Sequence, residues 1–300
     1  MLTSIFIALG FYFSYKISLL LINNNKIDIL LLPIIQVSTL LITYHIFCTA
    51  FGFNNGIYTA STFLAIIHLI FRDKLETSPP LKLSPIYDEI NYKFLISLIA
   101  CSLIVLYPII TFDFYDKVTF IGHFSTTNNI INGTYPPLNL ADPEIPYSYH
   151  YGIDLFAALF TACLKIPVNV TFKILTFASI MYTAFAFSLL FANIFSAKKI
   201  LPVLPFILIF TSGLPYLGSI GSYYDLGSFG GSSFPPHIIA LFFQAPWIIG
   251  IPAAYGLIYI FMSKHSLALK DYIAITVILV MLCFTQELIA LVISGSFLGH

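Results

Sequence analysis

The sequence predicts an all-α fold, a polytopic integral membrane helical bundle with about eight spans. Only 9% of the residues are charged and 59% are hydrophobic, whereas soluble domains carry about 25% charged residues. This number of charged residues is too small to cover a water-facing surface. The bundle must therefore lie in a membrane. The formal net charge is zero and Arg72 is the only arginine. Nucleic-acid binding needs a basic face and is therefore excluded as a function.

Apolar runs recur along the whole chain, and a membrane helix needs about 20 mostly apolar residues. One further run, at 153–166, is bounded by Gly152 and Pro167 and, at about 14 residues, is too short to span comfortably. The predicted spans are 2–22, 29–53, 56–71, 94–112, 169–195, 200–217, 237–262 and 272–293.

The basic residues predict the sidedness of the loops, because Lys and Arg collect in cytoplasmic loops. All the basic loops share one side only if the run at 153–166 does not span. We therefore expect a juxtamembrane helix over 149–166 on the outer side, together with loops 112–150 and 216–236. The chain then forms one transmembrane domain, 1–300, whose outer loop and juxtamembrane helix occupy 112–166. The basic loops that define the cytoplasmic side are 72–93, 196–199 and 263–271.

The longest polar interval is 112–155, and it opens with two acids, Asp113 and Asp116, at the mouth of the 94–112 span. A carboxylate at a membrane–water boundary can act as a general base or a metal ligand, because partial desolvation raises its basicity. The alternative is that these are solvated acids that end a helix.

Two histidines of this interval have carboxylates at helical spacing. Asp116 and His123 lie seven residues apart, about 10.5 Å along one face if 114–132 is helical, which suits the lining of one cleft. His150 and Asp154 lie four apart and would be neighbours on one helical face. Such a pair can orient an imidazole or hold a cation, or be an ordinary interfacial ion pair.

Tyr147, Tyr149 and Tyr151 flank His150. Their rings and hydroxyls suit a sugar platform, although tyrosine is also the usual residue of membrane interfaces. Glu287 falls late in the final apolar run. An acid inside a span is a candidate functional residue, unless it lies near the outer end and reaches the lipid headgroups.

The motifs of phosphate-binding loops, zinc proteases and serine hydrolases do not occur in the sequence. We interpret His45 and His68, in the N-terminal spans, as packing histidines. The four cysteines lie in apolar runs without metal spacing and are interpreted as small hydrophobic residues. No residues are therefore assigned as metal ligands.

The order of these features resembles a known family. A span ends beside an acid, an outer loop follows, and the loop holds an Asn-to-Pro-Pro pattern from Asn128 to Pro137. A Tyr/His-rich motif from Pro146 to Gly152 then leads into a short apolar helix. This layout resembles the GT-C superfamily of polytopic glycosyltransferases that use polyprenyl-phosphate sugars, and its prokaryotic members in particular. The resemblance covers about 112–195.

The resemblance implies a catalytic aspartate near the start of the outer loop, which falls on Asp113 or Asp116. That carboxylate would deprotonate an acceptor hydroxyl, which attacks the anomeric carbon and displaces lipid phosphate. The cation for the lipid phosphate would come from Lys117, His150, Lys165 or His237. The residues that we expect to bind substrate are His123, Tyr147, Tyr149, His150, Asp154, Lys117, His237 and Glu287.

The expected location is the bacterial inner (plasma) membrane, with the active loop on the extracytoplasmic side. The expected partners are membrane lipid and a polyprenyl-phosphate sugar. The cofactor stays open, with a divalent cation as the candidate, and so does the oligomeric state. Family members are usually longer, so we expect a fragment or a shortened relative. The alternatives are a transporter or flippase for a lipid-linked sugar, which the lack of an inverted repeat disfavours, and a non-catalytic GT-C-like protein.

Overall fold

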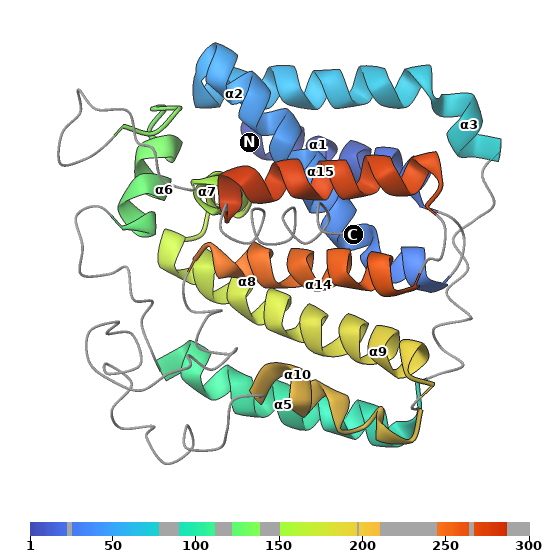
Figure 1. The fold of residues 1–300 in the computed structure, drawn as a ribbon. Helices are drawn as coiled ribbons and strands as arrows, with labels where there is room; N and C mark the ends of the chain where they lie inside the picture. Colours follow the sequence, from blue (N-terminus) through green and yellow to red (C-terminus); the bar gives the residue numbers. More distant parts are fainter. Residues whose placement is uncertain are drawn as a thin grey trace.

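The regular elements of the chain are helices throughout the part that the computed structural model describes, which confirms the all-α prediction. Long helices run side by side and form a bundle (Figure 1). The long helices are α1 (Leu2–Ser18), α2 (Lys26–Ile70), α5 (Tyr92–Thr111), α8 (Val168–Tyr182), α14 (Trp247–Ser263) and α15 (Leu269–Thr285). The described residues are 1–22, 26–77, 90–111, 122–138, 151–196, 198–210, 245–263 and 267–286.

Helix α2 consists of two legs that meet at Gly52, where φ is 75° and ψ is 163°. This conformation is accessible to glycine and strained for other residues. The bend lies next to the gap that the sequence predicts between 29–53 and 56–71, and Figure 1 shows the two legs running in different directions. They pack closely, because a Cβ atom on Gly56 would lie 2.5 Å from the Cα atom of Cys48. A hydrogen bond of 2.7 Å between the hydroxyls of Tyr44 and Ser61 joins the legs.

A second continuous helical stretch runs from Val168 to Ile194 and matches the predicted span at 169–195. It consists of α8, a π-helical segment η3 (Thr183–Phe187) and α9 (Ser188–Ile194). The π-helical turn inserts an extra residue per turn, a local change that hydropathy alone does not predict.

Three helical stretches of the described chain are long and apolar enough to cross a membrane: Leu2–Leu21, Ile29–Ile70 and Val168–Ile194. Shorter apolar helices occur at Tyr92–Tyr107 and Trp247–Ser263, and a third forms α7 (Gly152–Leu164). These lengths are compatible with a membrane protein. The number of eight spans stays a prediction.

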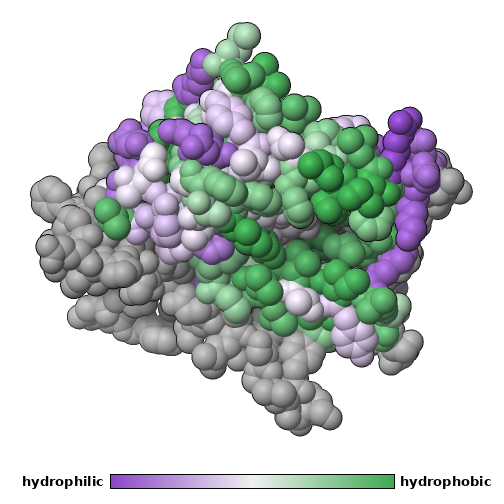
Figure 2. Space-filling view, turned by 90° about the horizontal axis from the view of Figure 1, so that it is seen from above, coloured by the Kyte–Doolittle hydropathy of each residue, from purple (hydrophilic) through white to green (hydrophobic). Residues whose placement is uncertain are grey.

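The outer surface of the bundle is apolar where side chains face away from other helices. Helix α5 exposes a stripe at spacings of three and four residues and buries the opposite face, with Phe94 and Cys101 both at 0% exposure. Figure 2 shows the same property over the helices seen from above, where a hydrophobic band separates hydrophilic residues at the two sides. Such a band is suited to a hydrocarbon environment. The exposed stripe of α5 consists of Ile96, Ile99, Leu103, Tyr107 and Ile110.

The bundle has two ends, which differ in the elements that they hold (Figure 1). The end that we call the α6 end holds α6 (His123–Ile131), the start of α1 and the start of α8. The opposite end, the α3 end, holds α3 (Arg72–Thr77), the start of α5 and the short 3₁₀ helix η4 (Lys198–Ile200). Which end faces which side of a membrane remains the prediction made from the lysines.

Helix α7 lies across the α6 end instead of along the bundle (Figure 1). Its first residue, Gly152, packs against Phe284 and Thr285 at the end of α15. Near its last turn, the carbonyl of Ala162 accepts a hydrogen bond from the Ser4 hydroxyl at the start of α1. The placement of this helix at a membrane surface is still a prediction, but its position across one end of the bundle is observed.

Candidate functional site

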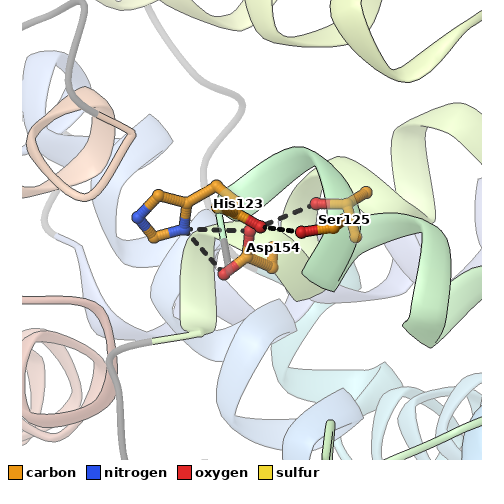
Figure 3. A network of polar contacts seen from close by, with 5 residues as sticks. His123, Ser125 and Asp154 are labelled. Carbon is orange, nitrogen blue, oxygen red and sulfur yellow. Dashed lines mark hydrogen bonds and ion pairs between the residues drawn. The ribbon is translucent and has the colours of Figure 1, made fainter. Parts of the chain in front are cut away.

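The α6 end contains a buried pair of oppositely ionisable side chains, His123 and Asp154 (Figure 3). His123 is the first residue of α6 and Asp154 lies in the first turn of α7. The Nδ1 atom of His123 lies 2.9 Å from Oδ2 and 3.0 Å from Oδ1 of Asp154. The exposed fractions of the two side chains are 6% and 0%, so water does not screen this interaction.

Two hydroxyl groups of α6 complete this arrangement. Thr127, one turn after His123, donates a hydrogen bond of 3.2 Å from its hydroxyl to Oδ1 of Asp154. The Ser125 hydroxyl donates to the carbonyl of Gly122 at 2.7 Å and so ties down the first turn of α6 (Figure 3). The carboxylate of Asp154 therefore has two donors from α6, His123 and Thr127. These bonds join α6 to the start of α7.

The chemistry of the pair follows from its geometry. When Nδ1 donates to the carboxylate, a neutral imidazole keeps its acceptor lone pair on Nε2, so Asp154 fixes the tautomer and the ring orientation of His123. A buried carboxylate is tolerated only when it is paired and hydrogen-bonded. The pair can thus orient an imidazole and also lock two helices together.

A second cluster surrounds His45 on the first leg of α2. Its Nδ1 atom lies 2.8 Å from the hydroxyl of Tyr135, which follows α6 in the chain. The imidazole stacks on the ring of Phe284 with centroids 4.9 Å apart and an angle of 16° between the planes. The ring of Tyr151 lies 5.9 Å from that of His45 and 5.8 Å from that of Tyr135. The cluster joins four segments of the chain at the α6 end.

The two clusters adjoin each other, because Tyr151 immediately precedes α7 and Asp154 lies in its first turn. Burial raises the pKa of Tyr135 well above its ordinary value, and the neighbouring Tyr151, Cys48 and Asp154 raise it further. Burial likewise raises the pKa of Tyr151. Both phenols are therefore held in the neutral form, in which they can donate hydrogen bonds.

Helix α5 also ends close to this site. The ammonium of Lys173, in the second turn of α8, donates a hydrogen bond of 3.1 Å to the carbonyl of Ile110. A lysine is favourable at the C-terminus of a helix, where carbonyls lack partners. The neighbouring Phe172 packs on Phe124 of α6 with ring centroids 5.1 Å apart. The chain therefore leaves α5 at the end where α6 and α7 meet.

The structure brings together two of the predicted site residues, His123 and Asp154. The sequence did not predict that these two residues pair with each other. Its spacing paired Asp154 with His150 on a helix starting at 149. Helix α7 begins at Gly152 after the capping residue Tyr151. His150 lies outside the described residues, so its pairing with Asp154 stays a prediction. The predicted site residues outside the described part of the chain are Asp113, Asp116, Lys117, Tyr147, Tyr149, His150, His237 and Glu287.

Three residues of the site were not predicted as functional: Thr127, Tyr135 and His45. Thr127 has a weak signal, since it lies four residues after His123 and would share its helical face. Tyr135 lies in the pattern from Asn128 to Pro137, which contributes to the family resemblance but did not indicate a role for this residue. The interpretation of His45 as a partnered packing residue is consistent with its bond to Tyr135, but the partner lies 90 residues away and no local pattern indicates it.

Within the described ranges no group of three or more His, Cys, Asp and Glu side chains is arranged to hold a metal ion. Comparison of the chain with protein-family models, with curated proteins and with solved structures gave no match.

Proposed function

We propose that this chain is an integral membrane glycosyltransferase that moves a sugar from a polyprenyl-phosphate donor to an acceptor hydroxyl at the α6 end of the bundle. The proposal joins the resemblance of 112–195 to GT-C enzymes with the position of the buried polar site. Localisation in a bacterial plasma membrane, with this end on the extracytoplasmic side, is part of the proposal.

The observation that carries the proposal is the junction of α6 and α7 at His123 and Asp154. These two residues lie 31 positions apart and were both expected to belong to a substrate site. The bond from Lys173 to Ile110 joins the end of α5 to α8, and the neighbouring Phe172 of α8 packs on Phe124 of α6. The segment with Asp113 and Asp116 follows α5 and precedes α6 in the chain, so both of its attachments lie at the end of the bundle that holds the pair (Figure 1).

In the proposed reaction, Asp113 or Asp116 removes the proton from the acceptor hydroxyl. The acceptor oxygen then forms a bond to the anomeric carbon, and the bond from that carbon to the lipid phosphate oxygen breaks. The electron pair of the broken bond leaves with the phosphate. A general base typically contributes about 10²- to 10⁴-fold to such a step.

The buried pair has a different part in this proposal. A side chain at 0% exposure, as for Asp154, does not touch a bound sugar. Asp154 is therefore assigned as a positioning residue that fixes the ring of His123 and the mutual placement of α6 and α7. His123 lies at the start of α6, next to the segment that would hold the catalytic acid.

The proposal is tested with the purified full chain in proteoliposomes supplied with polyprenyl-phosphate sugars and a hydroxyl acceptor. Appearance of glycosylated acceptor and free polyprenyl phosphate supports it. Donor binding without turnover contradicts it in favour of a non-catalytic relative. Movement of the intact donor between leaflets without transfer contradicts it in favour of a flippase.

A further inference from the structure

The α3 end holds most of the basic side chains that the structure describes. Helix α3 has two basic and two acidic residues, and Arg72 pairs with Glu76 at 2.6 Å. The net charge of α3 is therefore zero. The start of α5 and the helix η4 have three lysines and no acid in residues 92–111 and 198–210. These three lysines are all exposed and lie at one corner of this end, which we call the α5–η4 corner.

This corner is built by contacts between segments far apart in the sequence. The Ser97 hydroxyl on α5 donates a hydrogen bond to the carbonyl of Pro202, two residues after η4. Phe94 is fully buried, and its ring stacks on that of Phe185 with centroids 6.1 Å apart. The bond from Ser97 to Pro202 places Lys93, one turn before Ser97, at the same corner as η4, which holds Lys198 and Lys199.

Large apolar side chains adjoin the three lysines. Tyr92 is 68% exposed, and the ammonium of Lys93 lies 6.0 Å from the centroid of its ring. Phe195 is 62% exposed just before η4. The exposed stripe of α5 begins with Ile96, one turn after Lys93. Positive charge is therefore continuous with an apolar surface, and aromatic rings lie at the boundary.

We propose that the α5–η4 corner binds an anionic phospholipid, with its phosphate at Lys93, Lys198 and Lys199 and its acyl chains along the exposed stripe of α5. A charged head attached to apolar chains matches both parts of the surface, whereas free phosphate matches only the lysines. Clusters of basic residues at the edge of a membrane span attract anionic lipids, and aromatic rings are favoured at the headgroup level. This inference does not depend on the proposed enzyme activity.

The test uses the detergent-purified full chain titrated with phosphatidylglycerol, phosphatidylcholine or inorganic phosphate. Retained lipid is measured by native mass spectrometry, and the midpoint of thermal unfolding is followed in parallel. Phosphatidylglycerol is expected to bind at least about tenfold more tightly than phosphatidylcholine. The triple variant Lys93→Gln, Lys198→Gln, Lys199→Gln is expected to lose roughly 100-fold in that affinity, because each basic residue near a lipid surface contributes on the order of a fivefold factor.

The matched control removes three lysines of the same end that lie outside the corner, through Lys16→Gln, Lys74→Gln and Lys270→Gln. This variant is expected to stay within about threefold of the wild type. The corner variant with arginine in place of all three lysines keeps the charge and is expected to bind similarly to the wild type. If the triple glutamine variant does not fold, the single variants Lys93→Gln and Lys199→Gln are compared with Lys16→Gln in the same assay.

Three results would overturn the inference. Equal loss of affinity in the corner and control variants would mean that the whole end attracts anions without a site. Equal binding of phosphatidylcholine would remove the role of lipid charge. Stabilisation by inorganic phosphate as strong as that by phosphatidylglycerol would mean that the ligand is a free anion and not a lipid.

Discussion

The Nδ1 atom of His123 lies 2.9 Å from Oδ2 of Asp154, and this contact joins the first residue of α6 to the first turn of α7 in a place that water hardly reaches. Thr127 supplies a second donor to the same carboxylate. The contact makes the junction of the two helices sensitive to the loss of either partner, because a buried ionised group is costly once its partner is removed.

We expect His123→Ala to destabilise the fold by about 3–5 kcal/mol, the usual cost of breaking a buried pair. Asp154→Ala should cost less, because an imidazole that has lost the carboxylate can be buried in its neutral form, whereas a carboxylate that has lost the imidazole remains a buried charge. Unfolding of the variants in detergent measures the difference.

The double variant His123→Ala, Asp154→Ala completes the cycle and should be no less stable than His123→Ala alone. Thr127→Val removes one hydrogen bond to a charged acceptor and should cost about 1.5–3 kcal/mol. Strictly additive effects of the two alanine substitutions would mean that the pair does not interact.

Local spacing could not have predicted this pair. The sequence places His150 four residues before Asp154 and therefore suggests that pair, which lies outside the described residues. The contact that the structure describes is instead with His123, 31 residues earlier. Such a contact is set by the packing of α6 on α7, and no periodicity in the sequence encodes it. The long helices were predictable, because their apolar content over about 20 residues is a local property. The bend of α2 at Gly52 was predictable as an interruption, because the polar Asn-Asn-Gly segment beside it breaks the apolar run.

A second prediction concerns the hydrogen bond between Tyr135 and His45. Tyr135→Phe removes the hydroxyl and keeps the ring, so its contact with Tyr151 can persist, and the expected cost is about 1 kcal/mol. Phe284→Leu removes the stacking partner of His45 instead. The Tyr135→Phe effect should vanish in a His45→Phe background, and an unchanged effect in that background would show that the bond to His45 is not its source.

The pH dependence of stability follows from the raised pKa of Tyr135, which burial causes first and its neighbours second. In the unfolded chain this phenol ionises near its ordinary pKa of about 10, whereas in the folded chain it stays protonated. The folded state then binds more protons than the unfolded state, so the stability due to Tyr135 is present below about pH 10 and falls as the pH rises.

This effect is measured as the stability of the wild type minus that of Tyr135→Phe, between about pH 8 and pH 11. The other tyrosines are common to both proteins and cancel in the difference. We expect the difference to decrease above about pH 10. A difference that stays constant or grows over this range would contradict the burial of the phenol.

The close packing of the two legs of α2 gives a further prediction. Gly56→Ala would place a Cβ atom 2.5 Å from Cα and 2.7 Å from the backbone nitrogen of Cys48. Overpacking of this kind typically costs about 1–3 kcal/mol. The Sγ atom of Cys48 would also lie at 2.7 Å. Because the nearest contacts include two backbone atoms, removing the thiol through Cys48→Ala should not restore full stability. Full rescue of Gly56→Ala by Cys48→Ala in thermal unfolding would mean that only the contact with the thiol is unfavourable.

In the proposed function, an aspartate just beyond the end of α5 acts as the base in sugar transfer. Asp113 is favoured over Asp116, because the catalytic acid of the family that the chain resembles lies nearest the end of its span. Asparagine at either position keeps the size and most of the hydrogen bonding but cannot accept the proton. Donor binding should therefore change little, because the lost interaction belongs to the transition state.

The most direct test measures the rate of sugar transfer from a polyprenyl-phosphate donor in proteoliposomes for the wild type, Asp113→Asn, Asp116→Asn and the double variant, with donor binding measured on the same samples. We expect the rate to fall by about 10²- to 10⁴-fold in one single variant and in the double variant, while donor binding persists. Full activity in both single variants and in the double variant would contradict the mechanism.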